Sequence, residues 1–145
     1  KAMVERELEP YRRDGGPKVA IKGSDVLLPP QCTSILAMTL HELATNAVKY
    51  GALSQNNGQL NVAWKTQRGN RLLLVWEEKG APMVPKLTAR KGFGSQLIDQ
   101  GIRHNLGGET KTEFRKAGLY VELNVPLKPS NEPRAKPDAV HAPAA

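Results

Sequence analysis

One amphipathic helix constrains the fold of this chain more than any other feature. From Cys32 to Tyr50, apolar residues recur at i, i+3, i+4 and i+7, which is the spacing of one buried helical face. At about 100° per residue, Glu42, Asn46 and Lys49 fall together on a polar stripe beside that face. The pattern therefore predicts a helix that packs on a core and carries a carboxylate, an amide and an ammonium group along one flank.

Shorter patterns predict the remaining elements. Gly51 is expected to stop the long helix as a C-terminal glycine. The apolar spacing predicts helices over residues 1–13 and 94–106, and strands over 18–22, 59–66, 71–78, 109–115 and 119–125. Residues 71–78 are apolar enough for a central strand. This order predicts an α+β fold, a two-layer α/β sandwich in which helices cover one face of a mixed sheet.

Composition narrows the class of protein. The chain has 145 residues, enough to bury a core. Residues 1–127 are expected to form one domain, and the Pro- and Ala-rich residues 128–145 a disordered tail. The net charge of +7 is scattered and aromatic residues are only 5%, so nucleic-acid binding is not expected. Because the sequence begins at Lys1 without an initiator methionine, we expect a fragment of a longer protein.

Two further observations bear on the compartment. No apolar run approaches the roughly 20 residues of a membrane span, so direct membrane contact is not expected. Cys32 is the single cysteine, which excludes an internal disulfide and indicates a reducing, cytoplasmic compartment.

The polar stripe of the long helix admits two interpretations. Mg²⁺ keeps several waters and takes only one or two protein oxygens, so Glu42 and Asn46 could hold a hydrated ion. Lys49 could then meet a phosphate group. The same three residues could instead form an ordinary solvated helix face.

Two glycine-bearing segments follow. Glu78 and Gly80 stand at the end of the predicted central strand, where a carboxylate can accept a hydrogen bond from an exocyclic amine and a glycine lets a flat base approach. Gly92 and Gly94 precede a predicted helix, whose N-terminus suits phosphate, although a plain turn has the same signature. The basic loop between them, 79–91, suits either a mobile lid over a polyphosphate or a solvated loop.

Four ordered motifs resemble the ATP-binding catalytic domain of bacterial sensor histidine kinases, in the branch named HWE. That branch is named for a histidine in the asparagine box and a Trp-x-Glu in the next box, and His41 and Trp76-Glu77-Glu78 match both. The motifs are HELATNAVKYGALS, LLLVWEEKGAP, GFGSQLI and LGGETKTEFRKAGLYVELNVPL. The resemblance covers nearly everything up to Leu127 and implies the Bergerat fold shared with the gyrase, Hsp90 and MutL ATPases.

The resemblance also implies roles for the matching residues. Asn46 would hold Mg²⁺, with Glu42 as the acidic residue near the metal and the γ-phosphate. Glu78 would read the adenine amine. The remaining nucleotide contacts would come from Lys49, Tyr50, Gly80, Arg90, Lys91, Gly92, Gly94 and Ser95. One departure is Ala81, which replaces the second glycine of the family's Gly-Gly-Pro.

The function that the resemblance implies is transfer of the γ-phosphoryl group of Mg·ATP to a histidine. That histidine would lie on a phosphoacceptor dimerisation domain of the same or a sister chain, which this sequence lacks. The phosphoryl group would then pass to the receiver domain of a response regulator. A serine kinase of the anti-sigma type and a nucleotide-binding module without transfer activity are the alternatives. His41 is expected to be a hydrogen-bonded structural histidine, with a role as acid or base as the alternative.

Overall fold

The computed structural model describes residues 1–82 and 93–127 and contains one five-stranded sheet in the order β1-β2-β3-β5-β4. β1 pairs with β2 in parallel, and every other neighbouring pair is antiparallel. The sheet is therefore mixed with β3 at its centre, as the sequence predicted. The strands are β1 (Lys18–Lys22), β2 (Gln59–Gln67), β3 (Arg71–Lys79), β4 (Glu109–Arg115) and β5 (Gly118–Pro126).

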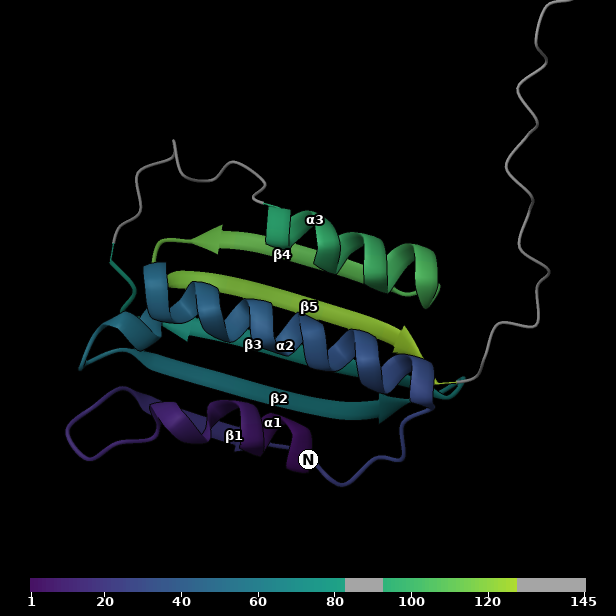
Figure 1. Ribbon diagram of the computed structural model, residues 1–145, viewed down its shortest axis with the longest axis horizontal. Coiled ribbons are helices and arrows are strands. Elements are labelled where there is room, and N and C mark those ends of the chain that lie inside the picture. Colours follow the sequence, from purple (N-terminus) through teal and green to yellow (C-terminus); the bar gives the residue numbers. More distant parts are fainter. Residues whose placement is uncertain (83–92, 128–145) are drawn as a thin grey trace, which may run out of the picture.

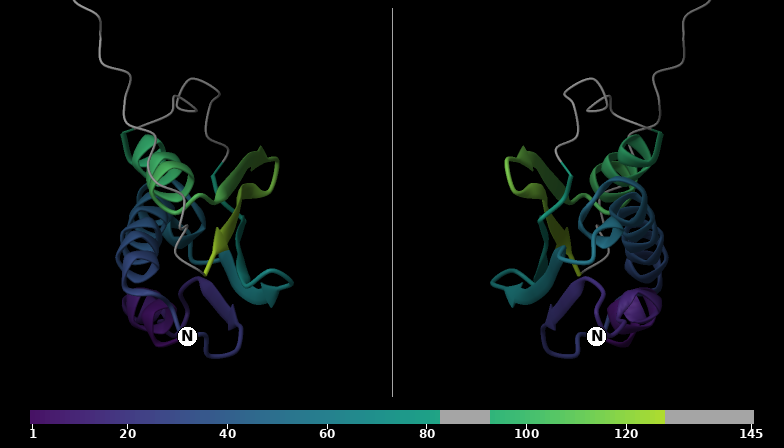
Figure 2. Two further views of the ribbon diagram at one scale, coloured as in Figure 1. Left: turned by 90° about the vertical axis from the view of Figure 1, so that its right-hand side faces the viewer. Right: turned by 90° about the vertical axis from the view of Figure 1, so that its left-hand side faces the viewer.

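The helices α1 (Ala2–Leu8), α2 (Pro30–Tyr50) and α3 (Phe93–Gln100) lie over one face of the sheet, with α2 between the other two (Figure 1). Seen edge-on, helices and strands form two separate layers (Figure 2). Short 3-10 turns follow α1 and α2, and a π-helical turn, Gly101–Asn105, continues α3. The predicted two-layer α+β sandwich is confirmed.

The core lies between α2 and the sheet. The buried face of α2 is the apolar one that the sequence spacing predicted, and it includes Leu36, Leu40 and Leu43. Along β3 the residues on the helix side are Leu72, Leu74, Trp76 and Glu78, with exposed fractions of 4, 3, 0 and 2%. Glu78 therefore continues an apolar row. Among the described residues, Thr39 is the other buried polar side chain.

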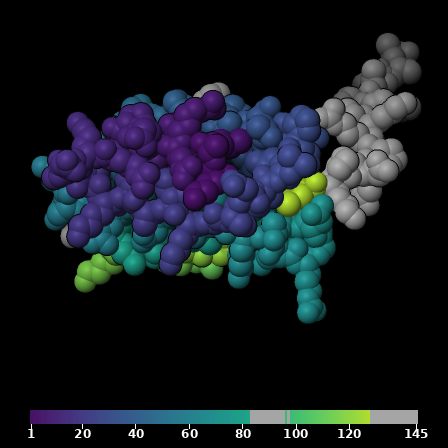
Figure 3. Space-filling view, turned by 90° about the horizontal axis from the view of Figure 1, so that it is seen from below, coloured from purple at the N-terminus to yellow at the C-terminus, as the bar shows by residue number. Residues whose placement is uncertain are grey.

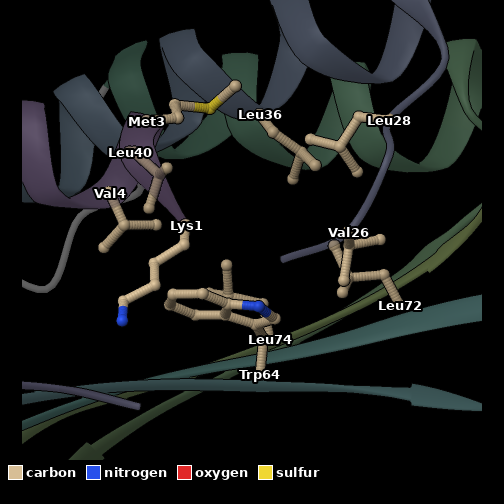
Figure 4. A pocket seen from close by; sticks show the side chains of 10 residues that line it. All are labelled: Lys1, Met3, Val4, Val26, Leu28, Leu36, Leu40, Trp64, Leu72 and Leu74. Carbon is tan, nitrogen blue, oxygen red and sulfur yellow. The ribbon is translucent and has the colours of Figure 1, made fainter. Parts of the chain in front are cut away.

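A small apolar cavity of ≈ 40 Å³ lies under α1, beside the first half of α2 (Figure 4). The volume is close to that of one water molecule, far below the several hundred Å³ of a nucleotide pocket. Trp64 lines this cavity, and its Nε1 donates a hydrogen bond to the Ser24 carbonyl at 2.8 Å. The N-terminal segment through β1 covers this flank of the molecule (Figure 3). This cavity is therefore too small to hold a nucleotide.

Other predictions fall partly outside the described residues. The tail, 128–145, lies outside them, as does 83–91 of the predicted basic loop, so the division into domain and tail stays a prediction. Cys32 is buried as expected, and burial raises the pKa of its thiol. None of the helices in the described part of the chain combines the length and hydrophobicity that crossing a bilayer requires.

Candidate functional site

The polar stripe of α2 lies on the flank that faces α3. At the first turns of α2, Ile35 lies against Gly101, since a Cβ on Gly101 would come within 3.1 Å of Ile35 Cγ2. Glu42 and Asn46 follow Ile35 by about two and three helical turns, so they lie on the same flank. Both side chains are half-buried. α2 ends and α3 begins towards the same side of the molecule, on the left of Figure 1.

The oxygens of this stripe are available to a ligand. Among the described residues, no hydrogen bond or ion pair engages the side chain of Glu42 or Asn46. One carboxylate and one amide oxygen fit a hydrated Mg²⁺, which takes few protein ligands. Lys49 and Tyr50 are exposed at the end of the same helix, so a bound anion could reach the Lys49 ammonium.

Glu78 is the carboxylate at the end of the buried row of β3. Its Oε2 accepts a hydrogen bond from the Ala52 backbone N–H at 2.8 Å, and its Oε1 accepts one from Trp76 Nε1 at 2.9 Å. Burial raises the pKa of the Glu78 carboxyl, while the hydrogen bonds from Trp76 and Ala52 oppose that rise. The carboxylate is thus held in place from two sides, by the strand and by the residue that begins the turn after α2.

Gly51 ends α2 as predicted. Its backbone is extended, with φ −114° and ψ −157°, instead of left-handed. A Cβ on Gly51 would overlap Glu78 Oε2 and would lie 2.8 Å from Ala47 Cα. Glycine is required here because the buried carboxylate approaches the backbone at the end of the helix.

Gly80 turns the chain where β3 ends. Its φ of +73° is a left-handed conformation that favours glycine, and a Cβ there would lie 3.3 Å from the Asn57 carbonyl oxygen. Its part in admitting a base stays a prediction. Among the other predicted nucleotide contacts, Arg90, Lys91 and Gly92 lie outside the described residues, while Gly94 and Ser95 belong to the first turn of α3.

His41 joins two helices. Its Nδ1 lies 2.8 Å from Glu7 Oε1, so it links α2 to α1. The expected hydrogen bond of His41 is present, with Glu7 as its partner, while its structural role stays a prediction. His41 thus contacts α1, on the other side of α2 from the stripe that faces α3.

Sequence reasoning missed two groups at Glu78, namely the Ala52 N–H and the Trp76 indole N–H. The Ala52 contact leaves no sequence signal, because it joins residues 26 positions apart. The Trp76 contact could have been found, since residues two apart on a strand share a face.

The chain is similar to histidine kinases in sequence and in fold. It is 38% identical over 127 residues to the blue-light-activated histidine kinase 1 of Erythrobacter litoralis (strain HTCC2594), over 86% of this chain and 35% of that relative. The histidine kinase domain of the Erythrobacter litoralis EL346 blue-light activated histidine kinase matches with a TM-score of 0.69 and 21% identity, over 86% of this chain and 61% of that chain. No protein-family model matches the sequence.

A further solved structure holds a second protein. The histidine kinase ThkA in complex with the response regulator protein TrrA matches with a TM-score of 0.68 and 18% identity, over 90% of this chain and 40% of that chain. These solved structures share the fold of this chain. The chain spans about a third of the length of the curated relatives such as the Erythrobacter enzyme. This chain therefore has the fold of histidine kinase catalytic domains and is similar in sequence to blue-light-activated histidine kinases, in keeping with the HWE branch.

Proposed function

We propose that this domain binds Mg·ATP and passes the γ-phosphoryl group to a histidine on a phosphoacceptor dimerisation domain of the same or a sister chain. One observation carries the proposal: Glu42 and Asn46 present unengaged oxygens, side by side on the half-buried flank of α2 that faces α3. Polar residues that only contact solvent normally lie on the side of a helix that faces away from its neighbours.

The chain's own residues would bind and orient the nucleotide. Asn46 and Glu42 would hold Mg²⁺, which would neutralise negative charge on the phosphates. Glu78 would receive the adenine amine beside Gly80. The phosphates and the ribose side would be contacted by Lys49, Tyr50, Arg90, Lys91, Gly92, Gly94 and Ser95. Transfer breaks the bond between the γ-phosphorus and its bridging oxygen, which leaves with ADP, and forms a phosphorus–nitrogen bond on the acceptor imidazole.

The partners follow from the same chemistry. A phosphohistidine can pass its phosphoryl group to an aspartate, so we propose a response regulator receiver domain as the next acceptor. The complex of ThkA with its response regulator supports this choice. The proposed location is the cytoplasm, which supplies the ATP. No contact with nucleic acid or with a membrane is part of the proposal.

The test is calorimetric titration with ATP, with and without Mg²⁺, of the wild type and Asn46→Ala. Loss of one metal-binding oxygen should weaken Mg·ATP binding by about tenfold or more, because a hydrogen bond or contact to a charged group is worth about 1.5–3 kcal/mol. Thr45→Ala is the matched control, since it changes the neighbouring residue on α2 by a similar volume. If Asn46→Ala binds Mg·ATP as tightly as the wild type, the assignment of the metal site is refuted.

A further inference from the structure

Trp76 is the largest fully buried side chain among the described residues, and its polar atom is directed at the candidate site. The indole Nε1 donates to Glu78 Oε1 at 2.9 Å, while the Ala52 N–H donates to Oε2 at 2.8 Å. A phenylalanine or leucine could fill core space at this position without bringing a hydrogen-bond donor. The indole N–H therefore has a consequence beyond packing.

Two donors on different oxygens fix the carboxylate more tightly than one could. The terminal torsion of a glutamate is broad, so a single hydrogen bond would still let the carboxylate plane rotate. Here the Trp76 and Ala52 donors approach from β3 and from the end of α2. An ionised carboxylate has about four lone-pair positions, and these donors use one on each oxygen. These two hydrogen bonds also set the orientation of the lone-pair positions that remain.

We propose that Trp76 is a positioning residue, whose indole N–H sets the orientation in which the Glu78 carboxylate accepts the amino group of adenine. The inference rests on the proposed function, in which Glu78 reads that amine. The Trp-x-Glu spacing allows this hydrogen bond, because residues two apart on a strand project from the same face of the sheet. Guanine presents a carbonyl oxygen where adenine has its amine, so a fixed carboxylate repels it, whereas a carboxylate free to rotate can turn away.

The sharpest perturbation keeps the shape of the side chain and removes only the donor. Trp76→benzothienylalanine replaces the indole N–H by sulfur, and Trp76→Phe is the encoded counterpart. The same two replacements at Trp64 are the matched control. Trp64 Nε1 also donates a hydrogen bond, to the Ser24 carbonyl at 2.8 Å, but Trp64 lines the apolar cavity under α1 and does not contact Glu78. Thermal unfolding of each variant shows whether it is folded.

The measurement is competition of ATP and of GTP against a fluorescent ATP analogue. The wild type should prefer ATP, and the Trp76 replacement should reduce the ATP-over-GTP preference by about tenfold, the effect of one hydrogen bond to a charged group. The Trp64 replacement should leave the preference unchanged. A folded Trp76 variant with the full wild-type preference overturns the inference.

A second readout does not depend on the variants' affinity. The two indole N–H resonances in a nitrogen-15 NMR spectrum can be assigned by Trp76→Phe and Trp64→Phe. Saturation with ATP should move the Trp76 signal and leave the Trp64 signal in place, and a stationary Trp76 signal overturns the inference.

Glu78→Gln separates this inference from the function on which it rests. If the wild type binds neither nucleotide, or if Glu78→Gln keeps the full preference for ATP, the proposed adenine recognition itself fails. If Glu78→Gln loses the preference and the Trp76 isostere keeps it, the positioning role alone fails.

Discussion

Gly51→Ala is expected to destabilise the fold, although the local backbone suits alanine. With φ −114° and ψ −157°, the residue is in the extended region that any residue adopts. At such a site, glycine to alanine normally raises the free energy of unfolding by about 0.4–1 kcal/mol, because the unfolded chain loses freedom. Here the added Cβ would overlap Glu78 Oε2 and lie 2.8 Å from Ala47 Cα, so the carboxylate or the end of α2 must move.

The geometry sets the size of the effect. Displacing the carboxylate breaks the 2.8 Å hydrogen bond from the Ala52 N–H to a buried charged group, which costs about 1–3 kcal/mol. Crowding against the Ala47 backbone adds about 1–3 kcal/mol. After the gain from the unfolded state is subtracted, the free energy of unfolding should fall by roughly 1–5 kcal/mol.

The assay is urea unfolding of the wild type, Gly51→Ala, Glu78→Ala and the double variant. Because Glu78→Ala removes the oxygen that the new Cβ meets, the cost of Gly51→Ala should fall by about 1–2 kcal/mol in that background. Gly101→Ala is the control, since its Cβ would meet only a methyl carbon of Ile35 at 3.1 Å. If Gly51→Ala is as stable as the wild type, or costs the same in both backgrounds, the close approach of Glu78 to the helix end is refuted.

Glu78→Gln should also change how stability depends on pH. Burial raises the pKa of Glu78 above its ordinary 4.5, so its contribution to folding stability is full below pH 4.5 and is lost as pH rises through the folded-state pKa. Urea unfolding below pH 4.5 and above the folded-state pKa of Glu78 should show that the free energy of unfolding falls less in Glu78→Gln than in the wild type. An identical pH dependence of the two proteins would contradict this expectation. The 145-residue chain should bind ATP without labelling itself with γ-phosphate, since His41 is bound to Glu7 and His104 lies on the turn after α3. A phosphoacceptor domain added separately should be labelled slowly, because the millimolar effective concentration of a tethered domain is lost. Acid-labile label on the chain alone would mean that it carries an acceptor histidine, and acid-stable label on the added domain would favour the serine-kinase alternative.

The sequence by itself determined which residues share a face of one element. Helical spacing placed Glu42 and Asn46 on one flank of α2, and the apolar character of residues 71–78 indicated a central strand. Both are confirmed, because the periods of helices and strands are fixed by backbone geometry and do not depend on what surrounds them. The resemblance to histidine kinases was readable for a similar reason, since each of its motifs is one uninterrupted run of residues.

Only the tertiary structure decided which residues from distant parts of the chain come into contact. The order of the strands, the partner of His41 and the contact of Ala52 with Glu78 join residues far apart in the chain, and no local period encodes such distances. Gly51 shows the difference most clearly. The sequence located the end of the helix correctly. The carboxylate that excludes a side chain there comes from a strand packed beneath the helix, and so it leaves no local signal.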